Sequence, residues 1–369
     1  MSGAMCAGGS AMGLAPGAGA RLCRGAAAAR SGGSSAAVRR VVTRAVADDA
    51  LQGYKATTCL FFPGQGAQSI GMARDVCAEL PAAKRLFEEA SETLGYDLLD
   101  RCVQGPAEVL NSTAVSQPAI FVSSMAAVEK FRATDEGAAA LASATVAAGL
   151  SLGEYTALCY AGAFSFADGV KLVKARGEAM QAASDKTSSG MAAIIGLDAE
   201  ATDALCAKAR ADTGKEVRIA NYLCNGNYAV SGDMEAVEHV MKIAKPEFKA
   251  RMAVKLAVAG AFHTDFMAPA VPFLKTALDS VDIQSPKLAV VSNVDVTSHA
   301  DPAVIKDILQ RQVTSPVQWE STIKELIGRG FGKGYELGPG AVISGIVKRI
   351  DKTVTVENIS VDAPKEAKK

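Results

Sequence analysis

Apolar runs that stop at glycine or proline alternate along this chain with amphipathic stretches at helical spacing. The run at 57–62 ends at Pro63-Gly64, which is typical of a buried strand. Further strands are predicted at 144–149, 288–292 and 334–337. Helices are predicted at 81–94, 118–131, 166–183, 302–312, 319–328 and 342–350, with Pro118 in a first helical turn. Strands that alternate with helices predict an α/β fold, a mostly parallel sheet covered on both faces.

The middle of the chain has a different order of predicted strands and helices. Strands predicted at 191–196, 216–220, 228–231 and 250–254 and helices at 199–210 and 233–244 give the order β-α-β-β-α-β. This order is typical of a ferredoxin-like unit. We therefore expect a core formed by 55–186 and 256–360, interrupted by a small α+β subdomain at 187–255. The tail at 361–369 is expected to be disordered.

The first 47 residues differ from the rest in composition. They contain six arginines among alanine, glycine and serine, and the first acidic residue of the chain is Asp48. Such a stretch is typical of an organelle transit peptide. A disordered basic tail without a targeting role has the same composition. We take the plastid stroma as the expected destination and the mitochondrial matrix as the alternative.

Composition excludes several function classes. Thirty-nine basic and 39 acidic residues balance, which gives no support to nucleic-acid binding. No apolar run approaches the ~20 residues that cross a bilayer. Eight scattered cysteines without a C-x-x-C pair, and only three histidines, give no metal signature and are typical of buried thiols in a reducing compartment. We expect a monomer that binds neither nucleic acid nor membrane.

The strongest chemical signal is Ser151 in the sequence Gly149-Leu-Ser-Leu-Gly153. A strand is predicted before it and a helix after it, so the pattern predicts a sharp turn that presents the serine hydroxyl. The glycines permit a turn too tight for a Cβ, and the following helix N-terminus supplies unpaired N–H groups. A chance match to so short a motif is the alternative reading.

Seven short motifs in one order resemble the malonyl-CoA:acyl-carrier-protein transacylase family. They span 57–359 and are centred on 62–68, 116–119, 149–154, 176–177, 261–263, 315–319 and 336–340. The resemblance implies an α/β-hydrolase-like core with an inserted ferredoxin-like subdomain. It also implies that a serine takes malonyl from coenzyme A and passes it to the phosphopantetheine thiol of acyl carrier protein in fatty acid synthesis. The thioester is a substrate, and no cofactor or metal is expected.

The resemblance assigns the proton-transfer roles. Ser151 matches the nucleophile and His263 the base, although an isolated histidine beside an apolar run is otherwise more often a core residue. His239 and His299 lie in polar surroundings and are expected at the surface. In the family a backbone carbonyl orients the base, and we place it at Gln318, so that a dyad rather than a triad is expected.

The resemblance also assigns the binding roles. Arg176 matches the ligand of the malonyl carboxylate, although a surface arginine paired with Glu178 is the simpler reading from the residues alone. The amides of Gln65 and Leu152 match the oxyanion hole. Gln117 and Phe262 are expected to line the pocket.

Two positions depart from the family pattern. Leu150 stands where many members carry histidine, and Leu223 stands where members often carry a second asparagine after Asn221.

Two other functions remain open at this point. One is a general serine esterase or thioesterase on the same turn, and the other is a carrier-binding protein without activity. Basic residues at 245–255 and at Lys348-Arg349 are candidates for docking an acidic carrier protein.

Overall fold

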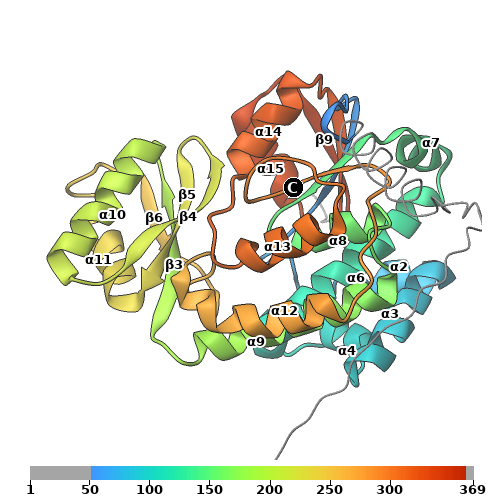
Figure 1. Cartoon of the computed structure of the whole chain (residues 1–369), viewed down its shortest axis with the longest axis horizontal. Coiled ribbons are helices and arrows are strands. Elements are labelled where there is room, and N and C mark those ends of the chain that lie inside the picture. Colours follow the sequence, from blue (N-terminus) through green and yellow to red (C-terminus); the bar gives the residue numbers. More distant parts are fainter. Residues whose placement is uncertain (1–50, 363–369) are drawn as a thin grey trace, which may run out of the picture. The chain divides into compact units, whose positions relative to one another are not determined.

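A five-stranded, wholly parallel sheet forms the centre of the protein (Figure 1). The structure is a computed structural model that describes residues 51–362, so the expected leader at 1–47 and most of the expected tail at 361–369 lie outside the described residues. The described residues belong to one compact unit. In spatial order the strands are β7 (Ala289–Val291), β2 (Val146–Gly149), β1 (Thr58–Phe62), β8 (Lys333–Leu337) and β9 (Thr355–Ile359).

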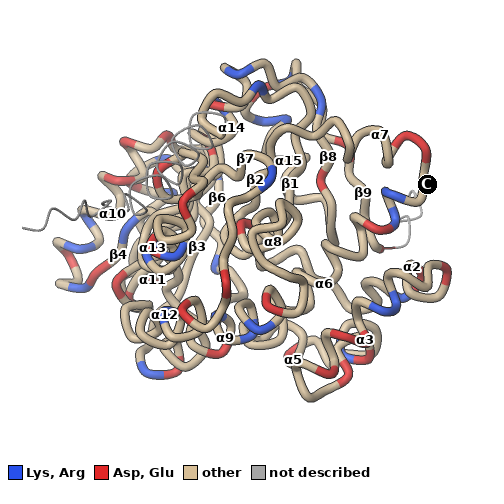
Figure 2. Tube along the Cα trace, turned by 45° about the vertical axis from the view of Figure 1, so that its right-hand side comes forward, with Lys and Arg blue, Asp and Glu red and all other residues tan. Residues whose placement is uncertain are grey.

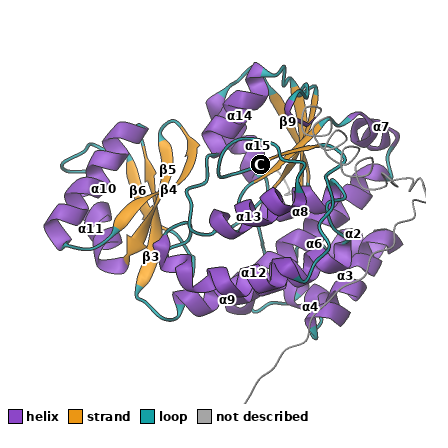
Figure 3. Cartoon of the chain, in the orientation of Figure 1, coloured by secondary structure: helices purple, strands orange, loops and turns teal. Residues whose placement is uncertain are grey.

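Successive residues of β1 point to opposite faces of this sheet, as the pleat requires. Leu60 and Phe62 belong to one buried cluster, whereas Cys59 and Phe61 belong to another that contains Trp319. Helices therefore cover both faces, as the alternating pattern predicts (Figure 3). The three neighbouring strands β7, β2 and β1 carry no charged residue (Figure 2).

The helices of the core were predicted best where the amphipathic pattern is strong. Helices α3 (Pro81–Leu94), α13 (Pro302–Gln312), α14 (Trp319–Gly328) and α15 (Val342–Ile350) have the predicted bounds. The remaining core helices are α2 (Arg74–Glu79), α4 (Leu98–Val103), α5 (Ala107–Asn111), α6 (Thr113–Arg132), α7 (Asp135–Ser143), α8 (Leu152–Tyr160), α9 (Phe166–Ser184), the 3-10 helix η1 (Asp265–Ala270) and α12 (Val271–Asp279). No helix in residues 51–362 is both long and apolar enough to span a membrane.

Helix α6 begins earlier than predicted. It starts at Thr113, so Pro118 lies inside the helix and not in its first turn. A proline there removes only the hydrogen bond that its own N–H would make to Ala114. The rest of α6 is buried among its neighbours, and that packing favours the longer helix.

A second, antiparallel sheet lies in the middle of the sequence. Its strands, in spatial order, are β4 (Val217–Cys224), β5 (Asn227–Asp233), β3 (Ser189–Ile195) and β6 (Met252–Lys255). Helices α10 (Ala199–Thr213) and α11 (Met234–Ala244) cover one face (Figure 3). The alternate residues Met191, Ala220 and Ala229 belong instead to the buried cluster of the core. This sheet therefore packs against the core through its other face.

Glycines allow three backbone segments to meet at the end of β2. A Cβ on Gly153 would lie 2.1 Å from the Phe62 carbonyl oxygen, and one on Gly149 would lie 1.9 Å from the Gly153 carbonyl carbon. A Cβ on Gly64 would lie 2.3 Å from the Leu150 carbonyl oxygen. These contacts are with backbone, which cannot move aside as a side chain can. Glycine is therefore required here for close approach.

We expect Gly153→Ala to destabilise the protein by about 1–3 kcal/mol or more, because its methyl group overlaps the end of β1. The matched control is Gly345→Ala in α15, where an added Cβ meets nothing within 4 Å. Helix propensity predicts that this control is neutral or stabilising by up to about 1 kcal/mol. Urea unfolding followed by circular dichroism measures both changes. Equal stability of the two variants would contradict the close-approach argument.

Candidate active site

Ser151 lies at the turn between β2 and α8, at the carboxyl end of the central strands. Its backbone adopts φ 53° and ψ −100°, a conformation that non-glycine residues rarely occupy. Strain of this kind persists only where the surroundings hold the residue in place. The predicted sharp turn is therefore present, and its serine is the N-cap residue of α8.

Two buried side chains from distant parts of the sequence hold this turn. Asn293, just after β7, accepts a hydrogen bond from the Ser151 N–H at 2.6 Å and donates to the Gly149 carbonyl at 2.8 Å. Gln312, at the end of α13, donates to the Ser151 carbonyl through Nε2 at 3.0 Å. Both are fully buried, so these bonds do not compete with water.

The three groups that the sequence analysis singled out converge on one point. The Ser151 hydroxyl lies 2.8 Å from His263 Nε2, and Arg176 Nη2 donates to the same hydroxyl oxygen at 3.0 Å. Arg176 and His263 are 1% and 3% exposed, respectively. The serine can thus donate its proton to the histidine while its oxygen accepts from the guanidinium.

The group that orients His263 is a backbone carbonyl, but it is not the one predicted. His263 Nδ1 lies 2.9 Å from the Gln312 carbonyl oxygen. The prediction of Gln318 is wrong, because the Gln318 carbonyl accepts from the N–H and hydroxyl of Thr322 in the first turn of α14. Asp265, two residues after the histidine, is 91% exposed and lies outside this arrangement.

The surroundings keep His263 neutral. Burial, together with the nearby Arg176 charge, lowers the pKa of His263 from 6.5 to about 4. A neutral ring whose Nδ1 faces a carbonyl oxygen carries its proton on Nδ1. Nε2 is then the free acceptor that faces the serine hydroxyl, the state that a general base requires.

Arg176 is buried without a carboxylate partner. Its Nη1 donates to Gln117 Oε1 at 2.7 Å and its Nη2 to Gln312 Oε1 at 2.9 Å. It forms no ion pair within residues 51–362, and the predicted alternative of a surface pair with Glu178 is absent there. Burial lowers the pKa of Arg176, although a guanidinium stays charged at neutral pH. The amide oxygens solvate the cation, and the nearby carboxyl group of Glu154 interacts with it electrostatically without pairing with it directly.

A buried carboxyl group supports the same network. Glu154, in the first turn of α8, accepts from Gln312 Nε2 at 2.6 Å and from the Asn293 N–H at 3.1 Å. Burial raises the pKa of Glu154 to about 7, and its two hydrogen bonds oppose the rise. Glu154 thus connects the two residues that hold the serine turn.

A cavity of about 260 Å³ opens beside the serine hydroxyl. Both expected oxyanion donors, Gln65 and Leu152, border it, and within residues 51–362 neither backbone N–H donates to another protein group. Phe262 also borders it. Gln117, expected to line the pocket, is not among its lining residues, but it is hydrogen-bonded to Arg176 and Met180, which both are. Leu150 and Leu223, the two departures from the family pattern, both line it and make this wall apolar.

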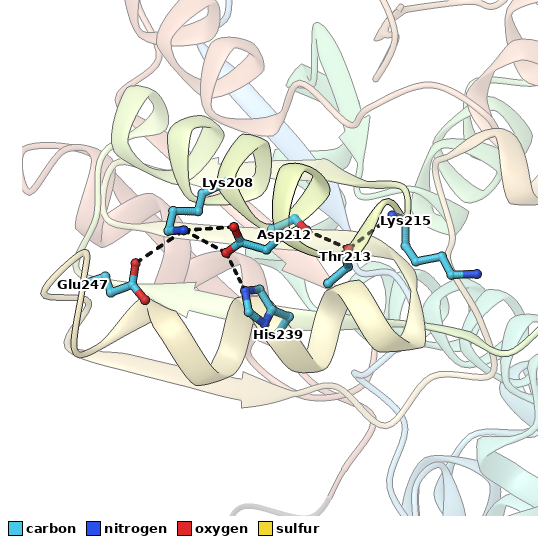
Figure 4. A network of polar contacts seen from close by, with 7 residues as sticks. Lys208, Asp212, Thr213, Lys215, His239 and Glu247 are labelled. Carbon is cyan, nitrogen blue, oxygen red and sulfur yellow. Dashed lines mark hydrogen bonds and ion pairs between the residues drawn. The ribbon is translucent and has the colours of Figure 1, made fainter.

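The other two histidines lie outside the cavity. His239 of α11 is hydrogen-bonded to Asp212 of α10, in a polar network that includes Lys208 and Glu247 (Figure 4). His299 pairs with Asp295 at 3.0 Å. Only His263, among the three, faces a serine hydroxyl.

Sequence reasoning missed Gln312, Asn293 and Glu154 as site residues. Asn293 had a detectable signal, since it follows the strand next to β2 and the carboxyl ends of parallel strands meet at one edge. Gln312 and Glu154 had none, because a glutamine at a helix end and a glutamate in a first helical turn are ordinary at a surface. The tertiary structure buries both residues and brings the end of α13 within hydrogen-bond distance of the start of α8.

This arrangement can do one kind of chemistry well. It holds a serine hydroxyl, a neutral imidazole facing it, two unpaired backbone amides and a buried guanidinium around one cavity, an arrangement suited to serine-dependent acyl transfer. Residues 51–362 contain no group of three or more histidine, cysteine or carboxylate side chains placed to hold a metal ion. All six described cysteines are buried and unpaired.

Comparisons with known proteins agree with this class. Residues 60–363 match the family model described as acyl transferase domain, and the chain belongs to this family. It is 42% identical over 300 residues to malonyl CoA-acyl carrier protein transacylase of Bacillus subtilis, covering 80% of this chain and 92% of that protein. It is 39% identical over 325 residues to the mitochondrial malonyl-CoA-acyl carrier protein transacylase of Homo sapiens, covering 82% of each. The solved malonyl CoA-acyl carrier protein transacylase of Coxiella burnetii superposes with a TM-score of 0.77 at 34% identity, covering 84% of this chain and 96% of that one.

We expect Ser151 to remain activated well below pH 6.5. His263 accepts a proton only when neutral, and its pKa of about 4 keeps it neutral down to that pH. The rate at which a neutral fluorophosphonate labels Ser151 should therefore reach half its maximum near pH 4. Circular dichroism at each pH verifies that the protein is folded.

Glu154, with a pKa of about 7, could add its own inflection to this profile. Glu154→Gln provides the control, because it removes the titrating carboxyl group and keeps the acceptor oxygen. A midpoint near 6.5 in both proteins would show that His263 is not held neutral.

Proposed function

We propose that this acyltransferase moves a malonyl group from malonyl-CoA, through an ester on Ser151, to the phosphopantetheine thiol of acyl carrier protein for fatty acid synthesis. The observation that carries the choice of malonyl is Arg176, a buried cation without a carboxylate partner 3.0 Å from the nucleophilic oxygen. A guanidinium can hold a carboxylate through two parallel hydrogen bonds. The names of the similar transacylases support the same donor and acceptor.

In the first half-reaction Ser151 attacks the thioester carbonyl carbon. His263 Nε2 takes the hydroxyl proton, and the Nδ1–H bond to the Gln312 carbonyl stabilises the imidazolium. The negative charge on the thioester oxygen faces the amides of Gln65 and Leu152. When the tetrahedral intermediate collapses, the carbon–sulfur bond breaks, the imidazolium protonates the thiolate, and coenzyme A leaves as the free thiol.

The second half-reaction reverses these steps with another thiol. His263, neutral again, takes the proton of the carrier thiol, and the thiolate attacks the malonyl ester. The intermediate collapses with cleavage of the bond to the serine oxygen, which recovers its proton from the imidazolium. The proposal needs no resident cofactor, because the thioester supplies the activated acyl group.

Replacement of Arg176 tests the substrate. We expect Arg176→Ala to lower kcat/KM for malonyl-CoA by about 30-fold or more, since truncating one partner of a buried charge pair costs about 2–5 kcal/mol. Acetyl-CoA should lose much less or gain, because it has no carboxylate to leave unpaired. Serine acylation measured by intact mass, with Ser151→Ala as the blank, gives both rates. Unchanged malonyl preference in this variant would refute the role of Arg176.

The same experiment separates a transferase from an esterase. Malonyl on the carrier thiol and free malonate are distinguished by the mass of the carrier and by chromatography of the small molecules. A transferase passes most of the serine-bound malonyl to the carrier. Free malonate as the main product, with carrier present, would favour the hydrolase.

The acidic carrier is proposed to dock beside α15. Val342 and Ile346 of this helix line the cavity, and the exposed Lys348 and Arg349 follow in the next turn. Two exposed cations on the helix that lines the cavity fit a partner of negative charge.

We expect Lys348→Glu and Arg349→Glu together to raise KM for the carrier about tenfold at low salt, with little effect on serine acylation by malonyl-CoA. Lys84→Glu and Arg85→Glu together on α3 are the control with the same change in charge, because both residues are exposed and do not border the cavity. Transfer kinetics at two salt concentrations measure the effect. An equal rise in the control would show that net charge alone is responsible.

We further propose that the arginine-bearing residues 1–47 direct the enzyme to an organelle. Their lack of acidic residues supports import. The human relative is called mitochondrial. A fluorescent fusion of the leader distinguishes the plastid, our sequence-based expectation, from the mitochondrion.

A further inference from the structure

The candidate base His263 lies outside the helices and strands, in a loop at φ 60°. Its position therefore depends on tethers to its neighbours. Two of them come from the segment after α13. His263 Nδ1 contacts the Gln312 carbonyl at 2.9 Å, and the His263 N–H donates to the Val313 carbonyl at 3.1 Å.

A third tether comes from the small subdomain. Arg218 of β4 donates from Nη2 to the next carbonyl, that of Thr314, at 2.7 Å. The same nitrogen donates to the His263 carbonyl at 3.2 Å. One guanidinium nitrogen thus joins the histidine loop to the segment whose carbonyl orients the imidazole.

The strand next to Arg218 strengthens this link. Ser231 of β5 is the cross-strand partner of Arg218, and its buried hydroxyl donates to the Phe262 carbonyl at 2.8 Å. Two neighbouring side chains of one sheet therefore hold two successive carbonyls, those of Phe262 and His263.

The nearest carboxylate does not compete with these carbonyls for the Arg218 guanidinium. Asp265 lies 3.9 Å from Nη2 and is 91% exposed, so solvent screens this pair. Arg218 also borders a cavity of about 330 Å³, separate from the one beside Ser151. This second cavity gives small solutes access to the guanidinium.

We propose that Arg218 is a positioning residue for the histidine base, through which the small subdomain sets the geometry of the Ser151–His263 pair. The inference rests on the proposed acyl transfer for its biological meaning. Its geometric basis is the bridge from one nitrogen to the His263 and Thr314 carbonyls. Without it, only the two bonds to the Gln312 and Val313 carbonyls join the loop to this segment, and the imidazole is held less firmly in line with the serine hydroxyl.

The test replaces Arg218 with alanine and measures kcat and KM for serine acylation by malonyl-CoA. We expect kcat to fall about 10- to 100-fold with KM little changed, since a small misplacement of a reacting group has effects of this size. Guanidinium ion at low, non-denaturing concentration should restore part of kcat by occupying the vacated space. Labelling of Ser151 by a neutral fluorophosphonate should fall in parallel, and this readout does not depend on malonyl being the substrate.

Arg210→Ala is the matched control. Arg210 belongs to the same subdomain and donates to a backbone carbonyl, that of Val217, but it contacts no part of the histidine loop. Its removal should lower stability without lowering kcat per folded molecule. Arg218→Lys, which keeps the charge, provides a second variant if Arg218→Ala does not fold.

Three results would overturn the proposal. They are an unchanged kcat in folded Arg218→Ala, an equal loss in Arg210→Ala, and a loss that guanidinium does not restore. The substrate and the role of Arg218 can fail separately. If the wild-type enzyme does not accept malonyl-CoA, the proposed substrate is refuted. If its fluorophosphonate labelling is normal and falls in Arg218→Ala, the role of Arg218 remains intact.

Discussion

The buried hydrogen bonds of Gln312 are the constraint on which the site depends. Its side chain contacts the Ser151 carbonyl, Glu154 and Arg176, and its backbone carbonyl contacts His263 Nδ1. One residue thereby relates the serine hydroxyl, the imidazole and the guanidinium. Because all these bonds are shielded from water, the loss of any partner leaves a buried polar group unpaired. The network thus favours a single arrangement of the three groups.

The backbone strain of the site follows from that arrangement. Ser151 and His263 both have positive φ, and each is held by contacts from other elements. Residues held in this way stay aligned in the absence of substrate, so little reorganisation is needed when a thioester binds. The glycines at 64, 149 and 153 also help to hold the serine turn in place, because they let three backbone segments approach closely.

We propose that Arg176 links substrate choice to proton transfer. Its charge and the burial of the site keep His263 neutral, which suits a base but opposes formation of the imidazolium during attack. A carboxylate bound to Arg176 would neutralise the local positive potential and make the imidazolium easier to form. A malonyl group would thus be favoured both by direct pairing and by its effect on the base, whereas an acetyl group would give neither.

Much of the fold and part of the site follow from local sequence, because amphipathic periodicity and glycine–serine turns depend on near neighbours. The bounds of α3, α13, α14 and α15, the β-α-β-β-α-β order of the middle segment and the turn at Ser151 are of this kind. The short helices α4 and α5 and the last strand β9 were missed, because their patterns are too short to stand out. Tertiary structure alone decided that the Gln312 carbonyl, and not that of Gln318, faces His263, since helix α14 already uses the latter. It likewise decided the burial of Arg176 and the contact of Arg218 with the histidine loop, because these depend on residues far apart in the chain that only packing brings together.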